Sequence, residues 1–126
     1  MTALATPPLP ILDEAVLDQV AAYLPEGRLA TNLRRLASQV EALLEPLSAD
    51  PSPGEEATLV ELAHALAGGA GMLGFRRLSG LCLDYEVACS GAPDAPVPAI
   101  PVLEARGALR AALQDSLPAI TRRIAG

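Results

Sequence analysis

Residues 28–45 have the sequence RLATNLRRLASQVEALLE. Apolar side chains recur in this segment at intervals of three and four residues, at Leu29, Leu33, Leu36, Val40 and Leu43. That spacing places them on one face of an α-helix, because about 3.6 residues complete a helical turn. The segment therefore predicts an amphipathic helix, for which Pro46 is the natural stop.

Prolines and glycines divide the rest of the chain into similar segments, and none has the pattern of a strand. Helices are predicted over about Ile11–Leu24 and Arg76–Ser90, and a last one begins near Val102. Pro118 falls inside this last helix, where it predicts either a kink or a new short turn capped by Ser116.

A further helix is predicted to begin beyond the loop at residues 48–54. Ser52 has the position of an N-cap, Pro53 that of the first helical residue, and Glu55 that of the third. Together they have the spacing of a capping box, in which two side chains satisfy backbone N–H groups at the helix start.

These helices predict an all-α fold, an antiparallel up-and-down four-helix bundle with an additional short N-terminal helix. A chain of 126 residues has room for one core, so residues 1–126 are expected to form a single domain. Residues 1–10 are expected to be flexible, and residues 91–101, with four prolines, to be a stiff extended connection.

Composition excludes several functions. Fifteen acidic residues against nine basic ones give a net charge of −6, the wrong sign for binding nucleic acid. All nine basic residues are arginines, so Schiff-base chemistry and a P-loop lysine are excluded. No apolar run approaches the roughly 20 residues that span a bilayer, and the first residues lack the basic region of a secretory signal. We therefore expect a cytoplasmic protein without a membrane segment.

Cys82 and Cys89 lie seven residues apart in one predicted helix, or roughly 10 Å along its axis. A disulfide needs Cα atoms within about 7 Å, so this pair cannot close within an intact helix. The chain has a single histidine, which leaves no zinc site of the usual ligand spacing. Both cysteines are expected in the core, and no metal site is predicted.

His64 is predicted to face away from the core. On a helical wheel it lies about 160° from the centre of an apolar stripe. The stripe is formed by Leu59, Leu62, Leu66, Ala70 and Leu73.

Small residues follow the histidine on this outer face. Gly68, Gly69 and Gly71 each cost about 1 kcal/mol relative to alanine in a helix. Either they leave the imidazole open to another macromolecule, or they permit close packing of a neighbouring helix and His64 is an ordinary surface residue.

Residues 64–75, HALAGGAGMLGF, resemble the central signature of histidine phosphotransfer (HPt) domains. In that family the histidine is followed by a leucine two residues on, a glycine four on, and a Leu-Gly pair that closes the helix. Leu78, Cys82 and Glu86 resemble the next helix of the family, with Tyr85 in place of a leucine. The resemblance is dense over residues 64–86 and weak elsewhere. One departure is clear: the family commonly has a lysine three residues after the histidine, where this chain has Ala67.

The resemblance implies a phosphorelay carrier in two-component signalling rather than a turnover enzyme. His64 would accept a phosphoryl group from the aspartate of a response-regulator receiver domain and pass it to another receiver. A hybrid histidine kinase is a further expected partner. No cofactor of its own is implied, since Mg²⁺ is expected on the receiver.

The remaining site residues are expected around His64. Docking of a receiver is expected on a small, weakly apolar patch formed by Val60, Ala67, Gly68, Gly71 and Phe75. Arg76 and Arg77 would lie near the phosphoryl group or contact an acidic partner, or would simply be solvated. Glu61 would accept the second ring N–H of the imidazole, or be an ordinary surface acid.

Three alternatives stay open. A degenerate, interaction-only bundle would bind receivers or a kinase without carrying phosphate, and Ala67 is the feature that favours it. The chain could also be the carrier domain of a larger hybrid kinase. An enzyme with its own active site has little support, because Asp84 and Glu86, two residues apart, do not share a helix face. The receivers, the direction of transfer and the oligomeric state are not determined by the sequence.

Overall fold

The structure, a computed structural model, describes residues 9–49, 51–90 and 101–125. Within these residues it contains five α-helices and no strand, which confirms the all-helical prediction. The predictions for residues 1–10 and 91–101 fall almost entirely on residues 1–8 and 91–100, outside the described part. The helices are α1 (Glu14–Tyr23), α2 (Arg28–Ser48), α3 (Pro53–Met72), α4 (Arg76–Ser90) and α5 (Val102–Ala125).

The first two helices differ from their predicted bounds. α1 begins at Glu14, because Asp13 is its N-cap and Oδ1 of that residue accepts a hydrogen bond from the Val16 N–H at 3.3 Å. The prediction that Pro46 ends α2 is wrong. The helix continues to Ser48, since one more turn buries Leu47 with the apolar stripe of this helix.

The capping box of α3 is confirmed, with Ser52 and Glu55 each bonding the backbone of the other. α5 is continuous through Pro118, so the alternative of a new turn capped by Ser116 is wrong. Ser116 and Ile120 are fully buried and Ala119 is nearly so. This burial stabilises the helix on both sides of the proline.

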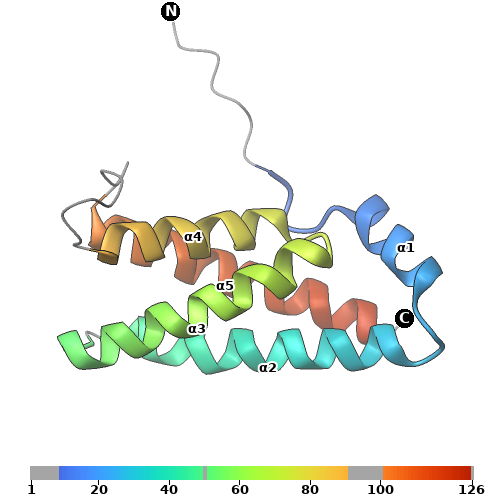
Figure 1. Ribbon diagram of the computed structural model, residues 1–126, viewed down its shortest axis with the longest axis horizontal. Coiled ribbons are helices and arrows are strands. Elements are labelled where there is room, and N and C mark those ends of the chain that lie inside the picture. The colour runs from blue at the N-terminus through green and yellow to red at the C-terminus, as the bar shows by residue number, and fades with distance from the viewer. Residues whose placement is uncertain (1–8, 50, 91–100, 126) are drawn as a thin grey trace, which may run out of the picture.

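Helices α2 to α5 form a bundle in which each contacts its neighbours: α2 contacts α3 and α5, and α4 contacts α3 and α5 (Figure 1). Leucines dominate the core between them. The predicted stripe of α3 needs one correction, because Leu62 is 39% exposed and Ala63 is buried in its place. Cys82 is fully buried, which raises the pKa of its thiol to about 12, and Cys89 is half-buried.

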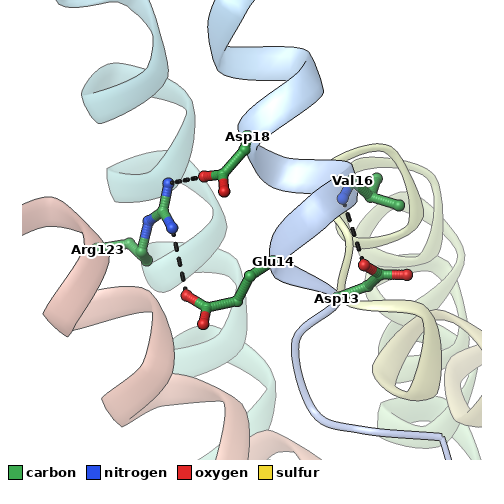
Figure 2. A network of polar contacts seen from close by, with 5 residues as sticks. All are labelled: Asp13, Glu14, Val16, Asp18 and Arg123. Carbon is green, nitrogen blue, oxygen red and sulfur yellow. Dashed lines mark hydrogen bonds and ion pairs between the residues drawn. The ribbon is translucent and has the colours of Figure 1, made fainter.

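α1 lies across the end of the bundle at which α5 ends (Figure 1). Leu17 anchors it in the core, and Arg123 of α5 donates hydrogen bonds to Asp18 at 2.9 Å and Glu14 at 3.3 Å (Figure 2). The start of α1 also contacts the turn after α3, where the Asp13 N–H bonds the carbonyl of Gly74 at 2.8 Å.

Within the described residues, no helix combines the length and the apolar character needed to cross a membrane.

Candidate functional site

The imidazole of His64 stands on the outer surface of α3, as predicted, with 68% of its side chain exposed. Its Nδ1 atom lies 2.9 Å from Oε2 of Glu86 on α4. A carboxylate accepts hydrogen bonds, so the ring tautomer that fits this contact has its proton on Nδ1, whose N–H donates a hydrogen bond to Glu86. In that tautomer the second ring nitrogen, Nε2, keeps its lone pair and makes none of the contacts described here.

Glu86, rather than Glu61, is the acid beside the imidazole. Glu61 is exposed on α3, but the carboxylate at hydrogen-bonding distance from the ring comes from α4. In the sequence, Glu86 stands out only as part of the resemblance to the second helix of the family pattern. Its contact with His64 depends on how α3 and α4 lie against each other, and residues 22 positions apart carry no local signal for that contact.

Two of the small residues after His64 serve helix packing. Ala67 is buried against α4, where the hydroxyl of Ser79 donates a hydrogen bond to its carbonyl at 2.8 Å. A Cβ atom added at Gly71 would lie 3.1 Å from Oγ of the same serine. The close-packing interpretation therefore holds for Ala67 and Gly71. It also follows that position 67, where the resemblance to HPt domains would place a lysine, faces a tightly packed neighbour in this chain.

Gly68 differs from these residues. It is exposed, one turn after His64, and a Cβ atom there would meet nothing within 4 Å. At this position the absence of a side chain leaves open space beside the imidazole, as the access interpretation requires.

One residue of the predicted docking patch, Phe75, lies in the core instead of on the surface. Phe75 is fully buried, because the turn at Gly74 directs the chain back and the Phe75 N–H bonds the carbonyl of Ala70 at 2.8 Å. It offers no surface to a partner. Val60 is half-buried and packs against the core. The surface around His64 is thus smaller than the sequence predicted.

Arg76 and Arg77 lie at the opposite end of α4 from the residue that contacts His64. They precede Glu86, the residue opposite the imidazole, by ten and nine residues, or about 14–15 Å along α4. Both line a cavity of about 420 Å³ on the α5 side of α4, together with Asp84. This placement favours contact with an acidic partner, or plain solvation, over contact with a phosphoryl group on the imidazole.

Among the residues that the structure describes, no three His, Cys, Asp or Glu side chains are grouped in a way that could hold a metal ion. The site thus consists of one exposed imidazole, one carboxylate at hydrogen-bonding distance from it, and an open surface at Gly68.

The family model described as Hpt domain matches residues 14–120, from the first residue of α1 into the last turns of α5. This chain belongs to the Hpt domain family. The match confirms the resemblance drawn from residues 64–86 and extends it over most of the chain. Hpt domains interact with receiver domains in phosphorelays, and membership supports a role as a phosphotransfer carrier in two-component signalling. Comparisons with curated proteins and with solved structures gave no match.

Proposed function

We propose that this Hpt domain carries a phosphoryl group on Nε2 of His64, between the aspartates of two receiver domains. The observation that carries the proposal is the exposed imidazole whose Nδ1 is engaged by Glu86 at 2.9 Å. A ring held in this tautomer presents one defined nitrogen to a partner.

In the transfer, the lone pair of Nε2 attacks the phosphorus of an aspartyl phosphate. The N–P bond forms, the P–O bond to the aspartate breaks, and the aspartate leaves as a carboxylate. Positive charge develops on the ring as the N–P bond forms, and the Glu86 carboxylate stabilises it, much as a carboxylate supports the histidine of a catalytic triad. Onward transfer reverses these steps, because a second aspartate attacks the phosphorus and the electron pair returns to Nε2.

The negative charge of the phosphoryl group needs a cation nearby, and we propose that the partner supplies this cation. Position 67 holds a buried alanine, and Arg76 and Arg77 line a cavity on another side of α4. Phosphoryl transfer relies on metal ions and cationic side chains for charge neutralisation. Mg²⁺ and basic residues of the receiver would supply both, with Arg76 and Arg77 left as candidates for contact with an acidic partner surface.

The proposal also covers the topology of the bundle, its location in the cell and the surface on which the receiver docks. Each of α2 to α5 contacts two neighbours, which supports an antiparallel up-and-down bundle to which α1 is added. We place this bundle, as a single domain, in the cytoplasm. The receiver would dock over His64 and Gly68, with Val60 and Gly71 at the margin.

The test is transfer of label from phosphorylated receiver domains to the purified protein, beside a His64→Gln variant. We expect acid-labile label on the wild type and none on the variant. If receivers bind but no label is transferred from any of a broad panel, the interaction-only alternative is correct instead.

A further inference from the structure

The cavity between α4 and α5 takes no part in the proposed phosphotransfer. It has a volume of about 420 Å³, and its lining includes Leu9, from the segment before α1, and residues from the first turns of α4 (Figure 1). Leu81, which lines it, and Glu86, which contacts His64, are five residues apart on α4. Their side chains therefore point about 140° apart around the helix. The cavity thus opens on another side of the domain than the imidazole.

Arg76 and Arg77 make one end of this cavity positive, although the chain has a net charge of −6. Within the described residues, neither guanidinium has a hydrogen-bond or ion-pair partner. Both stand in the first turn of α4, which contains no acidic residue, so their charges add to the positive end of the helix dipole. This placement disfavours the helix, and a carboxylate from outside the domain would offset it.

The charge changes sign along the cavity. Asp84 is the one acid among the described residues that line it, and it lies seven residues after Arg77, or about 10 Å along α4. A partner that fits this surface therefore has its acidic residues at the end where α4 begins.

Between these charges the lining is small or apolar. Leu81 packs against the core, and Gly80, Ala108 and Ala111 have no long side chains. A Cβ atom at Gly80 would meet nothing within 4 Å, so packing does not require glycine there, although glycine weakens a helix interior. Small residues on two neighbouring helices leave a channel that the side chains of a third helix can enter.

We infer that the cavity between α4 and α5 docks an amphipathic helix of a second protein, one with an Asp or Glu beside its apolar stripe. The apolar side chains would enter the cavity over Leu81 and Gly80, and the acid would pair with Arg76 and Arg77. The inference goes beyond phosphotransfer, because it adds a partner that binds on a side of α4 other than the one facing His64.

The probe is a phage-displayed library of a stable three-helix scaffold in which one exposed helix face is randomised. Binders are selected on the full chain after depletion on a double variant, Arg77→Glu with Gly80→Gln, which removes binders of other surfaces. We expect the remaining binders to carry Asp or Glu beside apolar residues at three- and four-residue spacings.

These binders should bind Arg77→Glu and Gly80→Gln, each alone, about tenfold more weakly than the wild type, the loss typical of a well-placed contact. Arg34→Glu and Gly68→Gln make the same changes at exposed positions outside the cavity and should bind as the wild type does. Arg77→Glu places an acid at the start of α4, and Gly80→Gln improves helix propensity. Neither variant should therefore unfold at a lower temperature than the wild type.

Three results would overturn the inference: no binder left after depletion, remaining binders without acidic residues, or an equal loss of binding in the control variants. Concentration-dependent dimerisation that is abolished by Gly80→Gln would assign the cavity to a second copy of this chain and would also overturn it. None of these outcomes depends on whether His64 carries phosphate, so the proposed function is tested separately.

Discussion

At the scale of single residues, the contact between His64 and Glu86 divides the two ring nitrogens between two roles. Nδ1 is held by the carboxylate at 2.9 Å, and the proposed function assigns the phosphoryl group to Nε2. The sequence could identify the histidine, because its place opposite an apolar stripe is a local property of one helix. It could not identify Glu86 as the partner of the ring, since that contact joins two helices and Glu61 stood nearer in sequence.

Removal of this carboxylate should slow the transfer moderately. The pair is exposed to solvent, with side-chain exposures of 68% and 34%, so its contribution is that of a surface pair, about 0.2–1 kcal/mol. Glu86→Ala is therefore expected to lower the rate of phosphotransfer by at most about fivefold, measured by single-turnover labelling from a receiver. Glu61→Ala is the matched control and should leave the rate unchanged. Equal rates for the two variants would show that Glu86 does not position the ring.

At the scale of elements, the packing of α3 on α4 explains why small residues follow the histidine and why they are not equivalent. Ala67 and Gly71 face Ser79, whereas Gly68 faces open space. The sequence is compatible with both close helix packing and open access to the imidazole. It does not show which small residue serves which purpose, because that depends on where α4 lies. The same limit applies at Pro46, where burial of Leu47 offsets the lost backbone hydrogen bond and the helix continues.

Added bulk at Gly68 should block the partner without disturbing the fold. Gly68→Arg places a long side chain in open space beside His64 and improves the helix propensity of its position. We expect loss of transfer from receivers together with unchanged helicity by circular dichroism. The control is Gly80→Arg, also at a position without neighbours within 4 Å, but on the wall of the cavity between α4 and α5. Normal transfer by the Gly68 variant, or an equal loss in both, would contradict docking at this face.

At the scale of the whole molecule, α1 is attached to the bundle through a small number of contacts at one end. Arg123 bridges two acids of α1 (Figure 2). Leu17 enters the core, and the Asp13 N–H bonds the carbonyl of Gly74. The sequence predicted α1 as a separate short helix from its flanking prolines and glycine. How α1 packs on the bundle could not be predicted, because its contacts come from residues distant in the sequence, in α5 and in the turn after α3.

Gly74 is the residue at which a substitution would most directly disturb the packing of α1 on the bundle. Its φ is +91°, and a Cβ atom would lie 2.6 Å from the carbonyl oxygen of Asp13. Gly27 has a similar φ of +82° but no neighbour within 4 Å, so Gly27→Ala should cost only the backbone strain, about 1–2 kcal/mol of unfolding free energy. Gly74→Ala should cost more, since the backbone of Asp13 must also move. Urea denaturation of the two variants measures the difference, and equal losses would mean that the turn at Gly74 does not hold α1.

The central claim is that His64 carries the phosphoryl group on Nε2, and NMR of the phosphorylated protein tests it most directly. The protein would be labelled with ¹⁵N in its one histidine, phosphorylated by a receiver, and examined for coupling between ³¹P and each ring nitrogen. The account predicts coupling to Nε2, with Nδ1 still protonated beside Glu86. Phosphorus bonded to Nδ1, or an unmodified ring in a protein that has taken up label, would contradict it.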